Sequence, residues 1–215
     1  MMKALIGCAA ALSTAACSTV GIRSGTEEPA YQQIARVGDL EIRRYDDRIA
    51  AQTVVSGDSG AARNAGFQTL AGYIFGGNSE RMSISMTAPV AQADARGGGS
   101  QTIAMTAPVA QAPSGTDRWV VQFFMPASYT METLPVPRDP AVELVVVPAE
   151  TYAVLTFSGV HSASSIEARK ADLLTGLAGS GWSARGEPVV WFYDPPWTLP
   201  ALRRNEVAVR VERAD

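Results

Sequence analysis

The chain has 215 residues and a formal net charge of −3, with 18% charged and 47% hydrophobic residues. This composition is typical of one globular domain or of one domain built from two halves, and it excludes a largely disordered chain. The mild acidity gives no electrostatic reason to expect nucleic acid as a partner. One His and two Cys weigh against a zinc site, an iron–sulfur cluster or a disulfide scaffold.

The N-terminal segment is predicted to be a targeting signal. Lys3 precedes a run of small apolar residues that ends at Cys17, which is the pattern of a secretory signal. The string Thr14-Ala15-Ala16-Cys17 resembles the lipobox of bacterial lipoproteins, in which the Cys carries the lipid; a signal with Cys17 unmodified is the alternative. We expect a signal peptide over 1–16, a lipidated Cys17 with a flexible tether over 17–30, and a folded domain over 31–215. The expected location is the periplasmic side of the bacterial outer membrane, or the periplasm after secretion.

The first half of the domain is predicted to contain two strands and a helix. Alternating side chains predict strands over 40–45 and 49–55. The period then changes over 61–75, where Phe67, Leu70, Ala71 and Ile74 recur at helical spacing. Gly76-Gly77-Asn78 is expected to end this helix.

A repeated string follows the first helix. Met-Thr-Ala-Pro-Val occurs at 86–90 and again at 105–109, with Gly97-Gly98-Gly99 between the two copies. Each copy predicts an extended segment broken at its Pro, and together they could form a hairpin. A strand over 119–125 is predicted next.

The second half repeats the order of the first. Strands are predicted over 142–147 and 152–157, followed by a helix that starts at Ser164 with Glu167 completing a capping box. Ile166, Leu173, Leu174 and Leu177 are expected to share one face of this helix. Strands over 189–193 and 207–211 close the chain, and the repetition predicts two similar α+β halves that share one sheet or barrel, with both helices outside.

Few residues carry obvious chemistry. His161 precedes the second helix and is expected to be a loop or cap residue, with a functional role as the alternative. The pairs Asp46-Asp47 and Glu27-Glu28 are expected to be solvated, because adjacent side chains of an extended segment point apart. Gly97-Gly98-Gly99 lacks a following Lys-Ser/Thr, which predicts a loop tip and not a phosphate-binding loop.

Several motifs in order resemble the SOUL haem-binding protein family, from about Tyr31 to Val211. They are Tyr73-Ile74-Phe75-Gly76-Gly77-Asn78, the Met-Thr-Ala-Pro-Val string, Tyr193-Asp194-Pro195-Pro196-Trp197 and Arg203-Arg204-Asn205-Glu206-Val207. Residues 38–45 also resemble the family's opening strand. The resemblance implies an α+β fold: a distorted antiparallel β-barrel of two pseudo-symmetric halves flanked by two helices. GyrI-like small-molecule-binding domains, some of which are hydrolases, have a similar architecture.

The resemblance also implies a binding site. Family members bind haem or related tetrapyrroles in a shallow apolar groove beside the first helix, which implies non-catalytic transport or buffering by a monomer. By position, the helix would contribute Arg63, Phe67, Leu70, Ala71 and Ile74. The opposite wall would contain Trp197, Leu199 and Arg203. A porphyrin is an apolar plate with two carboxylates, so apolar faces with Arg at the rim suit it.

The chain departs from the family at the expected iron ligand. Some members have a His just before the Tyr of the opening strand, where this chain has Arg44. An Arg stays protonated and does not ligate iron, so haem is expected to be held by apolar contacts and Arg–propionate pairs. Met86, Met105 or Tyr45 could also coordinate iron. Asn64, Gly72 and Thr198 replace basic residues that flank the groove in some animal members.

Two alternative functions follow from the same architecture. A GyrI-like enzyme acting on a non-haem ligand would need a carboxylate or Tyr in the groove, for which Glu41, Tyr73 and Glu206 are the candidates. An envelope interaction protein would hold a peptide in the groove, or nothing.

Overall fold

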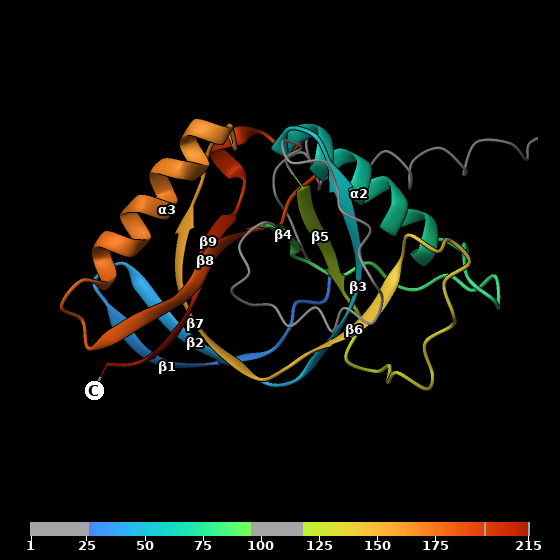
Figure 1. Ribbon diagram of the computed structural model, residues 1–215, viewed down its shortest axis with the longest axis horizontal. Coiled ribbons are helices and arrows are strands. Elements are labelled where there is room, and N and C mark those ends of the chain that lie inside the picture. The colour runs from blue at the N-terminus through green and yellow to red at the C-terminus, as the bar shows by residue number, and fades with distance from the viewer. Residues whose placement is uncertain (1–25, 96–117, 196, 215) are drawn as a thin grey trace, which may run out of the picture.

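A computed structural model describes residues 26–95, 118–195 and 197–214 (Figure 1). The predicted lipidation site Cys17, the second Met-Thr-Ala-Pro-Val string and the hairpin that it would complete lie outside these residues. Among the described helices, none has the length and apolar character needed to cross a membrane.

The described strands form a single antiparallel sheet in the order β1-β2-β7-β9-β8-β4-β5-β3-β6. Their bounds are β1 Tyr31–Val37, β2 Leu40–Tyr45, β3 Arg48–Ser56, β4 Val90–Asp94, β5 Arg118–Phe124, β6 Glu143–Val147, β7 Glu150–Phe157, β8 Trp182–Phe192 and β9 Asn205–Arg213. The barrel implied by the resemblance is not formed. The sheet bends strongly, but its edge strands β1 and β6 do not pair with each other, so it remains open.

The two predicted halves are present, and each has one helix. Helix α2 (Ser59–Ile74) packs on β3 and β5, and helix α3 (Ala163–Leu177) packs on β7, β8 and β9. Both helices lie on the same side of the sheet, at the top of Figure 1. The order β3–α2 is repeated by β7–α3, as the sequence predicted.

Helix α2 is anchored by its cap and by close packing. The Asp58 carboxylate accepts hydrogen bonds from the backbone N–H groups of Gly60 and Ala61, which the first turn leaves without intrahelical partners. Gly66 faces β5, where an added Cβ would lie 2.6 Å from a methyl carbon of Val121. The absence of a side chain at Gly66 therefore lets the helix lie directly on the strand.

Helix α3 is capped by Ser162 and not by Ser164 as predicted. The Ser162 hydroxyl accepts a hydrogen bond from the N–H of Ser165, at 3.2 Å, because the backbone at Ser162 is extended and the helix starts after it. Ile166, Leu173 and Leu177 are buried under the helix, but Leu174, predicted on the same face, is exposed.

The start of the domain differs from the prediction. Strand β1 was not predicted, and residues 26–30, which were assigned to the tether, contact the sheet. The Glu27 carboxylate accepts from the N–H of Ala127 at 2.7 Å, and Glu28 forms an ion pair with Arg204 at 3.0 Å. The expectation that Glu27 and Glu28 are merely solvated was therefore wrong.

Candidate functional site

A cleft lies between α2 and α3, and the strand register defines its floor. Val90 of β4 pairs with Phe123 of β5 on one side and with Phe192 of β8 on the other. Two residues along, Gln92 pairs with Val121 and Val190 in the same way. Paired residues of an antiparallel sheet point to the same side, and Val121 and Val190 belong to the cores under α2 and α3 respectively. These side chains therefore face the helices.

One end of the cleft contains a cavity of about 250 Å³. Its floor is largely apolar and its rim is charged, and it is lined by Asp58, Ser59, Gln92, Asp94, Trp119, Ala163, Ile166, Glu167, Lys170, Pro188 and Val190. The volume is just below the roughly 300–1,000 Å³ of small-molecule sites. A plate as large as a porphyrin would therefore extend beyond the cavity along the cleft.

The other end of the cleft brings together two arginines that are far apart in sequence. The Arg63 guanidinium lies over the Phe192 ring, 4.7 Å from its centroid, and the His161 ring contacts the same Phe192 at 5.2 Å. Arg203 Nη1 is 3.5 Å from His161 Nδ1. Arg203 is positioned by its Nε, which donates to the carbonyl oxygen of Thr198 at 2.8 Å. Arg63 and Arg203 thus both lie beside His161.

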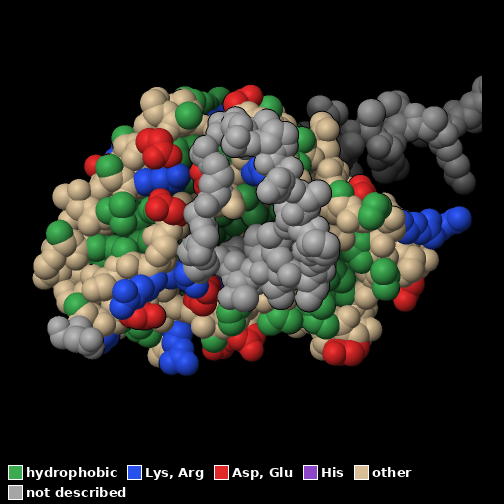
Figure 2. Space-filling model, viewed as in Figure 1, with side chains coloured by type: hydrophobic (Ala, Val, Ile, Leu, Met, Phe, Trp, Pro, Cys, Tyr) green, Lys and Arg blue, Asp and Glu red, His purple; other side chains and the backbone are tan. Residues whose placement is uncertain are grey.

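This end of the cleft is electropositive. Burial, with the charges of Arg63 and Arg203, lowers the pKa of His161 to about 4, so the imidazole is neutral at neutral pH. Burial and Arg203 likewise lower the pKa of Arg63. Elsewhere on the described surface shown in Figure 2, Lys and Arg side chains are interspersed with Asp and Glu and form no broad basic patch. The two arginines beside His161 suit an anionic group.

The predicted helix face divides into an outer and an inner part. Arg63 and Ala71 are partly buried, and Phe67 is 37% exposed with its ring 5.3 Å from that of Phe123. Leu70 and Ile74 are 0% and 1% exposed and form part of the core beneath α2. They cannot line an open groove, so the assignment of Leu70 and Ile74 to the binding surface is corrected.

The opposite wall is the loop around η1 (Pro200–Leu202). Trp197 and Leu199 are 64% and 52% exposed. The backbone N–H of Gly159 donates to the carbonyl oxygen of Pro200 at 2.8 Å, which connects this loop to the segment that carries His161. This loop therefore lies next to the segment that carries His161.

The residues of the cleft fit the plate and carboxylates of a tetrapyrrole. The partly exposed ring of Phe67 supplies apolar surface, and Arg63 and Arg203 supply cations, while Phe192 is buried beneath Arg63 and His161. Arg44, at the family's axial position, is exposed on β2, which does not contact α2. Among the described residues no cluster of three metal-binding side chains occurs. The neutral imidazole of His161, which sequence reasoning kept only as an alternative, is the metal-binding form of that side chain.

The other proposed iron ligands lie elsewhere. Tyr45 is buried in the aromatic cluster on the far face of the sheet, with its ring 5.7 Å from that of Trp191. Met86 is exposed just before β4, and Met105 lies outside the described residues. The positions that replace basic residues of other members are exposed at Asn64 and Gly72 and buried at Thr198.

A buried ion network occupies the face of the sheet opposite the helices. Glu206 is 0% exposed and receives two hydrogen bonds from Arg43, at 2.9 and 3.2 Å, two from Arg204, at 2.8 and 3.1 Å, one from the Tyr193 hydroxyl at 2.8 Å and one from the Thr156 hydroxyl at 3.2 Å. Burial opposes ionisation of Glu206, but Arg43 and Arg204 outweigh it and hold the pKa of the carboxyl below its ordinary value. Burial and Glu206 raise the pKa of Tyr193.

The candidates for acid–base chemistry are all engaged in such structural contacts. Glu41 forms an ion pair with Arg43 at 2.7 Å, and the Tyr73 hydroxyl donates to the carbonyl oxygen of Pro135 at 2.9 Å. Glu206 has its two oxygens occupied by the network. These contacts give Glu41, Tyr73 and Glu206 a part in holding the fold together.

The fold is similar to that of several solved proteins. The EcmrR C-terminal domain has a TM-score of 0.55 at 11% identity, with 86% of this chain and 99% of that chain covered. A hydrolase encoded by lin2189 from Listeria innocua has a TM-score of 0.53 at 12% identity, with 83% and 94% covered. An uncharacterized conserved protein from Listeria innocua has a TM-score of 0.55 at 12% identity, also with 83% and 94% covered. At this identity the likeness concerns the fold alone.

The sequence comparisons identify the family. No curated protein sequence matches the chain significantly. The family model described as SOUL heme-binding protein matches residues 26–210. This match spans most of the chain and includes both halves of the sheet, both helices and the loop with Arg203, so the chain belongs to the SOUL haem-binding protein family.

Proposed function

We propose that this protein binds haem or a related tetrapyrrole, without catalysis, in the cleft between α2 and α3. The observation that carries the proposal is the convergence of Arg63 and Arg203 on the rings of Phe192 and His161. Two cations beside an apolar surface match the two carboxylates and the flat face of a porphyrin. Membership of the SOUL family supports the same ligand class.

The parts of the cleft have separate tasks in this proposal. Phe67 and the exposed Trp197 contact the macrocycle. At about 25 cal/mol per Å², a few hundred Å² of buried apolar surface contributes several kcal/mol before association costs. Arg63 and Arg203 pair with the carboxylates and fix the orientation of the plate. The bound group would supply its macrocycle, with redox-active iron in the case of haem, while the protein carries or buffers it.

Absorbance titration of the purified protein with haem and with iron-free protoporphyrin tests the proposal. Wild type is expected to shift the Soret band of both at micromolar concentration. Phe67→Asp places a charge on the apolar wall and should weaken both at least tenfold, whereas Gln68→Asp, a neighbouring exposed position of α2, should not. No shift with either porphyrin, or equal binding by Phe67→Asp at unchanged thermal stability, would contradict the proposal.

We further propose that the protein works in the bacterial cell envelope, anchored through a lipid on Cys17. The N-terminal apolar run and the lipobox-like Thr14-Ala15-Ala16-Cys17 support this location. Mass spectrometry of the protein from cell membranes should show acylation that is absent in Cys17→Ala, together with loss of the variant from the membrane fraction. An unmodified Cys17 in a soluble periplasmic protein would instead support an ordinary signal peptide.

A small-molecule hydrolase of GyrI-like fold is the alternative, and the similarity to the Listeria innocua hydrolase supports it at the level of the fold. The contacts of Glu206 favour the binding function, because its carboxylate is already held by Arg43, Arg204 and Tyr193. Turnover that Glu206→Gln abolishes at unchanged stability would reverse this choice.

A further inference from the structure

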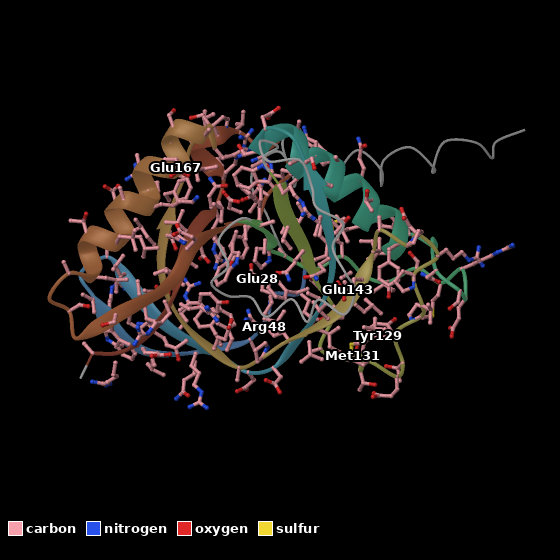
Figure 3. All side chains as sticks on the ribbon, viewed as in Figure 1. Glu28, Arg48, Tyr129, Met131, Glu143 and Glu167 are labelled. Atoms are coloured by element: carbon pink, nitrogen blue, oxygen red, sulfur yellow. The ribbon has the colours of Figure 1, made fainter. Side chains whose placement is uncertain are left out.

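Arg48, the first residue of β3, lies in a box of aromatic rings on the sheet face opposite the helices. Its guanidinium carbon is 4.4 Å from the centroid of the Tyr45 ring, 4.8 Å from that of Phe124 and 5.9 Å from that of Tyr152. Figure 3 shows Arg48 in the middle of the molecule, between its two halves and near Glu28. The ring faces hold the cation in place, but they leave its Nε and Nη2 groups unpaired.

Three buried donors at this place have no acceptor. Arg48 Nε and Nη2 and Trp191 Nε1 are buried and have no hydrogen-bond partner among the residues that the structure describes. Buried polar groups are almost always hydrogen-bonded, so each exception needs an explanation. Arg48 and Trp191 line the same cavity, of about 10 Å³, together with Glu28, Pro29, Tyr31, Tyr45, Pro89, Phe124 and Tyr193. The missing partner is therefore an acceptor that enters this cavity.

The geometry of the donors selects the acceptor. Nε and Nη2 lie on one edge of the planar guanidinium, where their N–H groups run side by side and match the two oxygens of a carboxylate. The acid in the cavity wall, Glu28, does not fill this role, because its oxygens are 3.0 and 3.3 Å from Arg204 Nη1. Arg48 therefore presents a complete two-donor edge to whatever enters.

We propose that this cavity binds the carboxylate group of a small organic acid, with Arg48 Nε and Nη2 on its two oxygens and Trp191 Nε1 as a further donor. The cavity has room for only about one water, and a carboxylate is larger, so its head group enters only as the side chains at the mouth move outward. The remainder of the acid lies at the mouth, where Tyr31 is 42% exposed. This site is on the sheet face opposite the α2–α3 cleft and does not depend on tetrapyrrole binding there.

Titration with benzoate, followed by NMR of Arg Nε–H and Trp indole N–H groups in the whole protein, tests the site. Benzoate should saturably shift the Arg48 and Trp191 signals, while benzamide, its neutral counterpart of similar shape, should not. Arg48→Lys keeps the charge but loses the two-donor edge and should weaken benzoate at least tenfold. Arg44→Gln, at an exposed position of β2, the strand that precedes β3 in the chain, should change binding less than twofold.

Two results would overturn the proposal. The first is the absence of a benzoate-dependent shift at Arg48 and Trp191 at tens of millimolar. The second is equal binding by wild type and by Arg48→Lys, with the variant shown to be folded by its thermal transition, since a bare charge would then suffice.

Discussion

The two faces of the sheet differ in how their buried charges are paired. On the face away from the helices, Glu206 is surrounded by Arg43, Arg204 and Tyr193, so cations and anion belong to the same chain. In the α2–α3 cleft, both charges that act on His161 are positive, and the imidazole between them is kept neutral. A charge that the chain balances itself holds the fold together, whereas an accumulation of one sign suits a ligand of the other sign.

The largest expected effect would come from breaking the balanced network. Glu206→Ala removes the buried carboxylate that Arg43 and Arg204 share and should reduce the free energy of unfolding by about 3–5 kcal/mol. Urea denaturation measures the loss. Glu187→Ala, at an exposed position of β8, is the control and should stay within about 0.5 kcal/mol of wild type. A loss below about 1 kcal/mol at Glu206 would show that the network is not structural.

A charge substitution in the α2–α3 cleft should change ligand affinity more than stability. Arg63→Glu reverses one of the two charges beside His161 and should weaken porphyrin binding about tenfold to a hundredfold, the range of a lost charge-assisted hydrogen bond. The same change should raise the pKa of His161 towards its ordinary value, which NMR titration would show. Arg36→Glu, at an exposed position of β1, controls for net charge. Unchanged affinity and an unchanged His161 pKa would remove Arg63 from the site.

A smaller effect is expected on the pH dependence of stability. The pKa of His161 is about 4 in the folded protein and near 6.5 ordinarily, so the unfolded chain takes up the proton first as the pH falls. Stability should therefore decline between about pH 6.5 and 4 and then level off. Because the ring is only partly buried, the decline should be on the order of 1 kcal/mol. His161→Asn should lack this decline, and an identical slope in that variant would assign it to other groups.

Arg48 should give the smallest effect on stability, although it is a half-buried cation. Arg48→Met removes the unpaired donors and keeps an apolar chain against Tyr45 and Phe124, so the free energy of unfolding should change by less than about 1 kcal/mol. Thermal and urea unfolding measure this. A loss above about 2 kcal/mol would place Arg48 with Glu206 as a structural charge.

The order of elements could be predicted from the sequence, because it depends on local periodicity. Strands β2, β3 and β5 and both helices lie within a few residues of the predicted positions. Strand β1 was not predicted, because it is an edge strand whose residues are mostly exposed and therefore show no alternating apolar pattern. The half of β8 that contains Gly186 and Glu187 is exposed and was missed for the same reason.

The site was only partly predictable, because its contacts join distant residues. Periodicity shows that Phe67, Leu70 and Ile74 recur on α2, but it cannot show which of them the sheet covers. The meeting of Arg63 with Arg203 depended on the family resemblance. The role of Phe192 follows from alternation in β8, since Val190 and Phe192 face the helices while Trp191 faces the other side. Nothing in the sequence shows that the donors of Arg48 are unpaired.

The contact between Gly66 and Val121 determines how high α2 sits above β5. An extra methyl at Gly66 would meet Val121 at 2.6 Å, so the helix would have to rise, and Arg63 and Phe67 would rise with it. The height of Arg63 and Phe67 above the sheet thus depends on Gly66, a buried residue that does not line the cleft. A larger residue at this one position would therefore widen the cleft without changing any of its lining side chains.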